Sequence, residues 1–439
     1  MKDKDWFENL PENWSAQPLK HFAMSFDSGS WGDEAKDNDN DCICLRVADF
    51  DYPRLAVNTS KELTIRNYPQ DVIDRLCLRK GDILIEKSGG GEKTPVGRTV
   101  LFNGSIKAVF ANFIERLTVK PEYDNRFIEY CLVAFYGIGG AYNYFNQTTG
   151  IQNLNMQHYS NDLYLPNPPI GTQIAISDYL DKRRASIDSA ISKHQQIIEK
   201  LDEYRKAVIT QAVTKGLNPN VEMKDSGDAI IPVVPSHWLW TRVKFTVNVV
   251  RGGSPRPIEQ YIVGENEDGY NWIKIGDATG GGKFITETKQ RIKPDGLSKT
   301  RLVHAGTLLL TNSMSFGHPY FLQIDGCIHD GWLAFSDYKG VLPEFLYYYL
   351  MSETTAHQFT TTADGSVVQN LNIDKVRNSH IALPPIDEQE AIVHYLNTVD
   401  DKINTAIQRH NQIIEGLQEY KQSLIYNAVT GKIDCTAEA

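Results

Sequence analysis

Three side chains in the second half of the chain have the types and the loose spacing of a metal-dependent nuclease site. Asp277 and Glu287 would hold a divalent cation, and Lys289 would assist the attacking water. Such spacing is common in unrelated sequences, and a related stretch around Asp49 has no Glu-x-Lys after it. The nearby Gly281–Phe284 lacks the earlier glycine and the Ser or Thr of a phosphate-binding loop. We therefore expect neither nuclease nor nucleotide chemistry from these residues.

A second candidate, Asn167–Ile170, is similar to the Asn-Pro-Pro-aromatic loop in which amino-methyltransferases hold the target amino group, and Phe135-x-Gly137-x-Gly139 is similar to their cofactor loop. Ile170 stands where an aromatic ring would stack on an extruded base. About 30 residues separate the two segments, too few for the βα units that lie between such loops. Leu383–Ile386 repeats the Pro-Pro pair without the Asn. We interpret Pro-Pro as the repeated start of a helix.

The cysteines and histidines give no metal framework. Of six cysteines only Cys42 and Cys44 are close neighbours, and no second Cys or His pair follows at zinc-ligand spacing. We expect reduced thiols, as in a cytoplasmic protein. His194 and His410 occupy equivalent positions of a repeat, and we interpret them as packing residues. The sequence thus predicts no catalytic residue, no metal site and no cofactor bound by this chain.

Composition sets the outer bounds. A chain of 439 residues with 41% apolar content is expected to form two or three globular domains. It has no run of 18 apolar residues and opens without a signal-peptide core, so we expect a cytoplasmic protein with no membrane partner. The net charge of −10 argues at first sight against a polyanionic partner. Much of the acidity lies in Asp27–Asp41 and at the C-terminal end, which leaves a basic face elsewhere possible.

The elements that must position any site occur twice. Pro169–Thr214 returns 216 residues later as Pro385–Thr430, and from Ile170 onward 21 of 45 positions are identical without a gap. This period is too long for a solenoid unit, so each repeat is predicted to be a domain with a retained appendage. Fainter matches keep the same order outside the block. They are Pro11 and Trp14 with Pro235 and Trp238, Gly29-Ser30 with Gly253-Ser254, Leu45–Asp49 with Ile273–Asp277, Gly81–Ile85 with Gly306–Leu310, and Gln152–Asn155 with Gln369–Asn372.

The repeated block predicts two long helices that pair with each other. Its apolar residues alternate spacings of four and three, which is the 3.5-residue seam of a coiled coil. The seam consists of Ile187, Ile191, His194, Ile198 and Leu201 in the first copy and Ile403, Ile407, His410, Ile414 and Leu417 in the second. Arg205 and Lys421 continue it, with long stems that cover the seam while their charges reach water.

The segments before the helices read as short strands with Gly and Pro between them and occasional helical stretches, a mixed α/β pattern. The predicted fold class is α+β, with two mixed α/β domains in tandem repeat, each followed by a long helix. The predicted boundaries are 1–165 for the first domain, 166–214 for the first helical region, 215–235 for a linker, 236–383 for the second domain, 384–431 for the second helical region and 432–439 for a tail.

These features together resemble the specificity subunit of type I restriction-modification systems over essentially the whole chain. The similar phrases are Gly81–Leu84, Gln152–Leu154, Lys215–Pro219, Arg251–Pro255, Trp272–Asp277 and Pro385-x-x-Glu388-Gln389. The resemblance implies two target recognition domains and an antiparallel helix pair with pseudo-twofold symmetry. One departure is Gly29-Ser30-Trp31, where the family has Gly-Thr-Pro, followed by an acidic stretch.

The resemblance further implies a non-catalytic subunit that binds double-stranded DNA and two modification subunits, which methylate adenine with S-adenosylmethionine. Restriction subunits, which use ATP and Mg²⁺, join the full complex. Two different domains on one scaffold are expected to read the two halves of an asymmetric target. A helix of about 30 residues spans ~45 Å, against ~34 Å for one DNA turn, so we expect the helices to set the spacer length.

Candidate DNA contacts follow from charge, small residues and loop position, because Lys and Arg neutralise phosphates while Asn, Gln and Arg read base edges. The candidates are Lys87, Ser88, Lys93, Thr94, Arg98, Tyr144, Asn146 and Gln147 in the first domain, and Arg251, Ser254, Arg256, Lys283, Lys289, Arg291, Lys299, Arg301, Asn312 and Ser313 in the second. The alternatives are a methyltransferase or nuclease in its own right and a coiled-coil adaptor that never reads DNA. Divergent domains on matched helices argue against the adaptor.

Overall fold

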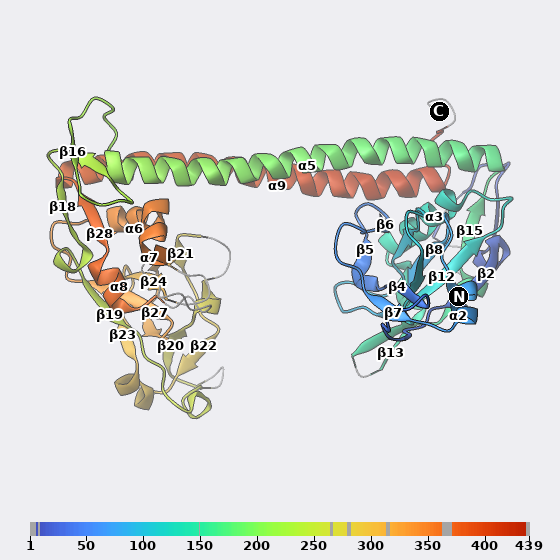
Figure 1. Cartoon of the computed structure of the whole chain (residues 1–439), viewed down its shortest axis with the longest axis horizontal. Coiled ribbons are helices and arrows are strands. Elements are labelled where there is room, and N and C mark those ends of the chain that lie inside the picture. Colours follow the sequence, from blue (N-terminus) through green and yellow to red (C-terminus); the bar gives the residue numbers. More distant parts are fainter. Residues whose placement is uncertain are drawn as a thin grey trace. The chain divides into compact units, whose positions relative to one another are not determined.

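The computed structural model describes residues 6–7, 9–148, 150–263, 267–278, 282–312, 317–361 and 371–435. The chain divides into two compact units, one made of Met1–His194 with Gln412–Ala439 and the other of Gln195–Asn411. Each unit holds one sheet-rich domain and parts of two long helices, α5 (Ile170–Lys215) and α9 (Ile386–Val429) (Figure 1). The predicted α+β class, with two mixed-sheet domains and two long packed helices, is confirmed.

In the first unit the strands form four sheets around a set of short helices. The first sheet has the order β2 (Ala23–Ser28), β12 (Ile114–Val119), β8 (Ile83–Glu86), β10 (Thr99–Leu101), β6 (Ala56–Val57), β5 (Phe50–Asp51). The second has the order β11 (Ala108–Phe110), β4 (Asp41–Leu45), β7 (Ile65–Asn67), β3 (Asp33–Glu34). The third is β13 (Phe145–Thr148), β14 (Ile151–Leu154), β9 (Ser88–Gly89), and the fourth is the pair β1 (Ser15–Pro18) and β15 (Tyr164–Asn167). The helices are α1 (Leu19–Phe22), η1 (Val47–Asp49), α2 (Gln70–Leu76), α3 (Asn125–Gly137), η2 (Gly140–Asn143) and α4 (Met156–Asp162).

The second unit is built in the same way. Its sheet orders are β19 (Asn248–Arg251), β27 (Trp332–Ser336), β24 (Leu308–Thr311), β25 (Pro319–Leu322), β21 (Phe284–Ile285); β22 (Gln290–Ile292), β20 (Tyr270–Ile273), β26 (Gly326–Ile328), β23 (Arg301–Val303); β18 (Leu239–Arg242), β28 (His380–Leu383); and β16 (Met223–Asp225), β17 (Val233–Pro235). Its helices are η3 (Val243–Phe245), η4 (Ile258–Gln260), η5 (Ile275–Asp277), η6 (Pro294–Lys299), α6 (Pro343–Met351), α7 (Glu353–Thr361) and α8 (Ile373–Asn378).

The two domains correspond strand by strand. The order β2-β12-β8-β10-β6 in the first domain matches β19-β27-β24-β25-β21 in the second. In each domain the second sheet contains one parallel pair, which sets Val109 opposite Cys44 and Cys327 opposite Trp272. The repeat seen in the sequence is therefore a repeat of topology, including the direction of strand pairing.

Both helices start and end in equivalent ways. Gln173 and Gln389 each lie four residues after the second proline of a Pro-Pro pair. Their side-chain amides donate hydrogen bonds to the carbonyls of Pro168 and Pro384, both 2.9 Å long. After the helices, Gly216 and Gly431 have φ values of 77° and 72°, the left-handed conformation that favours glycine at a helix end. The interpretation of Pro-Pro as a helix start agrees with this geometry.

The seam residues are less exposed than most of their neighbours along the two helices. Ile187 and Ile403 are 8% and 4% exposed, and the other eight seam residues are half-buried. In the first unit Lys421 Nζ lies 2.7 Å from Asp188 Oδ1, and in the second Arg205 Nε lies 3.1 Å from Asp400 Oδ1. These pairs join early α5 to late α9 and late α5 to early α9, so the helices are antiparallel.

Candidate nucleic-acid interface

A polar loop between β26 and β27 organises one surface of the second domain. The loop consists of His329, Asp330 and Gly331, and it lies against the end of β19. A Cβ on Gly252 would come within 2.2 Å of the His329 carbonyl oxygen, so only glycine allows the backbones to approach this closely. The adjacent Gly253 N–H donates to the Ile328 carbonyl at 3.1 Å, which fixes the loop to the strand.

Asp330 is the hub of this loop. Ser254 Oγ donates to its carboxylate at 2.8 Å, while Arg251 Nε and Asn312 Nδ2 donate to its backbone carbonyl at 2.7 and 2.9 Å. Arg256 Nη2 lies 3.6 Å from the same carboxylate. Burial raises the pKa of the Asp330 carboxyl, but the Ser254 hydrogen bond and the nearby cationic groups outweigh it, so the pKa lies below its ordinary value. The loop therefore carries a carboxylate at neutral pH.

A cavity of about 880 Å³ opens beside this loop. Its polar lining includes Ser254, Arg256, Lys274, Gln290 and His329, and the remaining lining residues are Pro255, Pro257, Ile258, Glu259, Ile262 and Trp272. Lys274 Nζ donates to Gln290 Oε1 at 2.8 Å. The cavity thus combines cationic groups with amide, imidazole and hydroxyl groups and the Glu259 carboxylate, which are groups that proteins use to contact phosphates and base edges.

The first domain has the same loop scaffold. Ser30 N–H donates to the Phe110 carbonyl at 2.9 Å, as Gly253 does to Ile328, and a Cβ on Gly29 would come within 2.1 Å of the Ala111 oxygen. Gly29 is therefore equivalent to Gly252, and Ser30 to Gly253. The predicted match of Gly29-Ser30 with Gly253-Ser254 is therefore wrong by one residue. It rested on the shared Gly-Ser pair, whereas the backbone hydrogen bonds pair Gly29-Ser30 with Gly252-Gly253.

A second cavity, of about 500 Å³, lies at this equivalent place and is lined by Trp31, Arg46, Val47, Ala48, Ala111, Asn112 and Phe113. In the shared register Trp31 takes the place of Ser254, Arg46 that of Lys274, Ala111 that of His329 and Asn112 that of Asp330. The Arg66 guanidinium lies 4.4 Å from the centre of the Trp31 ring, a cation-π contact. The same scaffold thus presents different chemistry in the two domains.

Comparison with known proteins agrees with this architecture. A family model for the type I restriction modification DNA specificity domain matches residues 255–415. The MjaVIII specificity subunit of Methanocaldococcus jannaschii is 25% identical over 404 residues, which cover 87% of this chain and 86% of that protein. The EcoBI specificity subunit of Escherichia coli is 23% identical over 316 residues, 68% of this chain and 65% of that protein. The chain is thus similar, over most of its length, to specificity subunits of type I restriction-modification systems.

Solved structures show the same fold. The HsdS subunit from Thermoanaerobacter tengcongensis has a TM-score of 0.51 at 15% identity, covering 99% of this chain and 100% of that one. A chain from work on complex assembly and conformational transition of the type I R-M system has a TM-score of 0.70 at 14% identity, covering 97% and 100%.

The predicted first-domain contacts separate into two groups. Lys93 and Thr94 are exposed in the turn after β9, and Asn146 and Gln147 are exposed on β13. Ser88 joins them, since its hydroxyl donates to Asn153 Oδ1 at 2.8 Å across β9 and β14. These five residues share the three-stranded sheet and its turn, so the structure brings them together.

The other three predicted first-domain residues have structural partners. Lys87 Nζ lies 2.9 Å from Glu115 Oε2, and Arg98 Nε lies 2.8 Å from the buried Glu86. Tyr144 is only 2% exposed and packs in the core, which removes it from the candidate interface. Sequence reasoning placed it on the surface because the polar residues that follow it are exposed.

In the second domain the Asp330 loop gathers Arg251, Ser254, Arg256 and Asn312, and Arg301 Nε donates to the Arg251 carbonyl at 3.2 Å. Asn312 is 1% exposed, so it supports the loop from below. The remaining candidates are placed differently: Lys289, Arg291 and Lys299 are exposed, Lys283 Nζ lies 3.2 Å from Asn397 Oδ1 on α9, and Ser313 lies outside the described residues. Lys283 thus joins the domain to the helix, and its pKa is lowered by burial.

Sequence reasoning missed Trp31, Asn112, His329 and Asp330 as candidate site residues. Each lies shortly after the end of a strand. Such isolated residues form no recognisable pattern in the sequence until the pairing of the strands is known. Arg46 and Lys274 lay within the matched phrases Leu45–Asp49 and Ile273–Asp277 and could have been found by comparing the two copies.

The nuclease-like residues rejected from the sequence have a structural explanation. Asp277 accepts a hydrogen bond from the backbone N–H of Lys274 at 2.8 Å and so closes η5, just as Asp49 accepts from Arg46 at 2.7 Å and closes η1. Glu287 and Lys289 are exposed. Within the described ranges there is no group of three His, Cys, Asp or Glu side chains placed to hold a metal ion, and no helix there is long and apolar enough to cross a membrane.

Proposed function

We propose that each domain binds one half of an asymmetric, two-part DNA target and that the paired helices bind two modification subunits and set the spacing between the half-sites. The observation that carries the proposal is the duplicated cavity. Its backbone scaffold is the same in both domains, while Trp31, Arg46 and Asn112 stand where the other copy has Ser254, Lys274 and Asp330. Such a pattern suits one docking mode with two different base preferences.

The test uses the complex with two modification subunits and S-adenosylmethionine, which we assign to the modification subunits. Long-read mapping of methylated adenine gives both halves of the motif at once. Arg256→Ala, which removes an 81% exposed side chain that lines the 880 Å³ cavity of the second domain, is expected to weaken DNA binding about 10- to 100-fold and to relax only one half-site. Arg46→Ala is expected to relax only the other half-site.

Arg377→Ala is a matched control, because Arg377 is an exposed arginine of α8 that does not line the cavity. It is expected to leave both half-sites unchanged. If neither cavity variant alters either half-site, the cavities are not the reading surfaces. If the wild-type complex shows no sequence preference at all in a shift assay, the adaptor interpretation replaces the proposal.

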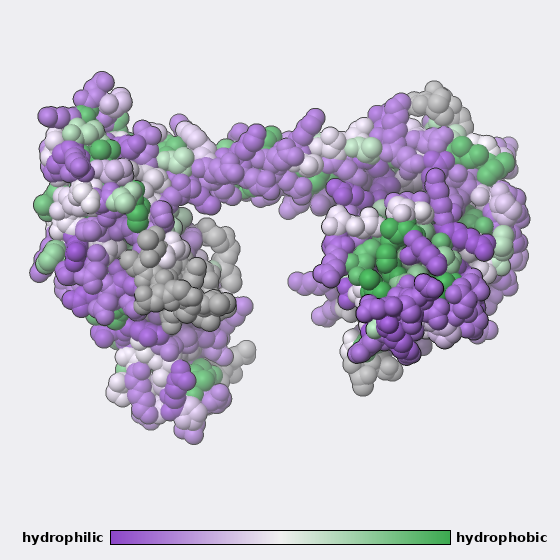
Figure 2. All heavy atoms as spheres, viewed as in Figure 1, coloured by the Kyte–Doolittle hydropathy of each residue, from purple (hydrophilic) through white to green (hydrophobic). Residues whose placement is uncertain are grey.

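A second surface supports the binding of one partner twice. Away from the seam, the exposed apolar pair Ile197 and Tyr204 recurs as Ile413 and Tyr420, with 39% and 54% exposure in one copy and 43% and 54% in the other. Although 24 of the 45 positions of the block differ between the copies, these apolar residues are the same in both. Packing in a core does not explain this, because the side chains are exposed. Figure 2 shows such hydrophobic spots between the hydrophilic residues of the helices.

Native mass spectrometry measures this proposal directly. Tyr204→Ala or Tyr420→Ala alone is expected to reduce the complex from two modification subunits to one, and the double variant to none. Lys200→Ala is the control, because Lys200 is exposed and is Gly416 in the other copy. Full occupancy in the double variant would show that the partner binds elsewhere. The ATP- and Mg²⁺-dependent restriction subunits are expected to join this core.

The spacing role rests on the continuity of the helices. α5 has 46 residues and α9 has 44, which at 1.5 Å per residue gives ~69 and ~66 Å, longer than the ~45 Å expected from the seam alone. Deleting or adding one turn at matched positions of both helices is expected to change the number of base pairs between the methylated half-sites. An unchanged spacer after such an edit would rule out this role.

A further inference from the structure

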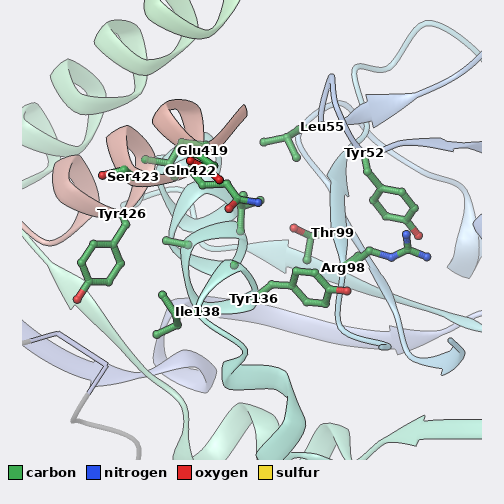
Figure 3. A pocket seen from close by; sticks show the side chains of 14 residues that line it. Tyr52, Leu55, Arg98, Thr99, Tyr136, Ile138, Glu419, Gln422, Ser423 and Tyr426 are labelled. Carbon is green, nitrogen blue, oxygen red and sulfur yellow. The ribbon is translucent and has the colours of Figure 1, made fainter. Parts of the chain in front are cut away.

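A cavity of about 450 Å³ lies in the first unit, where β10 and α3 of the domain meet the last turns of α9 (Figure 3). Its walls are mostly apolar, with Leu55, Val133, Ile138 and Ile425 among them. Figure 2 shows a hydrophobic patch framed by hydrophilic residues on this unit, beside the helix. Volume and lining are those of a small-molecule site, which is typically apolar with a few oriented polar groups.

The aromatic and charged groups around the cavity set its chemistry. Tyr52, Tyr136 and Tyr426 line it, and the Arg98 guanidinium lies 3.8 Å from the centre of the Tyr52 ring. Arg98 Nε is bound at 2.8 Å by Glu86, which also accepts from the Tyr52 hydroxyl at 2.9 Å. Because the Glu86 carboxylate neutralises the guanidinium, this wall carries no net charge and suits an uncharged ligand with a flat face. The remaining charged lining residue, Glu419, is exposed on the α9 side.

Hydrogen-bonding groups occupy two sides of the same cavity. Thr99 is 3% exposed at the floor, and within the described part of the chain its hydroxyl has no hydrogen-bond partner. Glu419, Gln422 and Ser423 of α9 face the space from the opposite side (Figure 3). A buried hydroxyl without a partner costs folding free energy, and a ligand with polar ring atoms would recover it.

The matching place on α5 is arranged differently. Thr210 occupies the α5 position that Tyr426 occupies on α9, and there the Glu353 backbone N–H at the start of α7 donates to the Thr210 hydroxyl at 3.0 Å. In the first domain α3 ends at Gly137, and both Gly137 and Ile138 line the cavity. The cavity is thus a feature of the first domain and does not follow from the shared repeat.

We propose that this cavity binds a small, neutral, planar heteroaromatic molecule of nucleobase size, which ties the first domain to α9. The site is separate from the cavities assigned to DNA, so its test does not depend on the proposed function.

The test is titration of the full-length protein with free adenine as the probe, followed by calorimetry and ligand-observed NMR. Ser423→Trp places a large ring at the exposed mouth of the cavity and is expected to weaken adenine binding at least tenfold. The matched control is Ala207→Trp at the equivalent, exposed position of α5, which is expected to leave the affinity unchanged. Thr99→Val, which keeps the shape and removes the hydroxyl, is expected to weaken binding about five- to tenfold.

Two further arms identify the site and the ligand class. Excess duplex DNA is expected not to displace adenine, and 1-adamantanol, which is apolar but not planar, is expected to bind at least tenfold more weakly. The proposal is overturned if adenine does not bind the wild-type protein, if Ser423→Trp and Ala207→Trp have equal effects, or if DNA competes. Unchanged melting temperatures of the variants confirm that the comparison is made between folded proteins.

Discussion

The most informative single change is Glu129→Gln in α3. Glu129 is 3% exposed beneath the helix pair of the first unit, and within the described residues its Oε1 atom has no hydrogen-bond partner. Burial raises the pKa of this carboxyl to about 8, against 4.5 for an ordinary glutamate, although the nearby Arg184 works in the opposite direction. We therefore expect the folded protein to hold Glu129 protonated at neutral pH.

The sign of the pH dependence follows from this difference. Between pH 4.5 and about 8 the folded state keeps a proton that the unfolded state has released. The contribution of Glu129 to stability is therefore greatest below pH 4.5 and is lost as the pH rises through about 8. Each pH unit in this window is worth ~1.4 kcal/mol, which gives a loss of about 2–3 kcal/mol between pH 5.5 and pH 7.5. Glutamine keeps the shape without the titration, so the variant is expected to lack this loss.

Native-state hydrogen exchange of the α3 amides at both pH values, corrected for intrinsic exchange, is the assay. The exposed Glu122→Gln is the control and is expected to keep the wild-type slope. The reasoning is refuted if Glu129→Gln retains the full pH dependence. It is also refuted if glutamine lowers α3 protection more at pH 7.5 than at pH 5.5, because Glu129 would then be an ionised partner that stabilises Arg184.

Other changes test the duplicated scaffold. Gly29→Ala and Gly252→Ala each bring a Cβ within 2.1 or 2.2 Å of a backbone oxygen. Each is therefore expected to destabilise its own domain by about 2 kcal/mol or more, measured by hydrogen exchange. Equal protection in variant and wild type would mean that the backbones shift freely. Asp49→Asn and Asp277→Asn remove the carboxylates that close η1 and η5, and a loss of about 1 kcal/mol is expected for each by thermal unfolding. Adding Mg²⁺ is expected to change neither wild-type melting temperature nor adenine affinity; a specific stabilisation lost in Asp277→Asn would restore the metal-site hypothesis.

The sequence predicted the fold well because the duplication supplied two readings of each element. Spacings of four and three identified both helices, and Pro-Pro followed by Gln marked both helix starts. Matched phrases such as Leu45–Asp49 and Ile273–Asp277 proved to be the same strand and closing turn. These signals are local, since each depends on residues within a few positions of one another.

Individual site residues were harder to predict because their setting depends on strand pairing. Arg98 and Lys283 are basic loop-flanking residues by sequence, yet Glu86 binds one and Asn397 the other. Tyr144 precedes exposed polar residues but points into the core. No local pattern distinguishes a lysine that reaches solvent from Lys283, whose partner lies 114 positions away.

The two copies also separate what the fold requires from what the function is free to vary. The bonds that fix the loop after β11 and β26 run between backbone atoms, through Ser30 and Phe110 in one domain and Gly253 and Ile328 in the other. These backbone bonds are present in both domains, although Asn112 stands in one loop and Asp330 in the other, so they do not depend on which of the two side chains is present. The seam differs from this loop, since all five seam positions carry the same residue in both copies. Under the proposed function, a protein that changes its DNA target and keeps its modification subunits is expected to vary the cavity residues and keep the helices, which is the distribution of identity and difference along this chain.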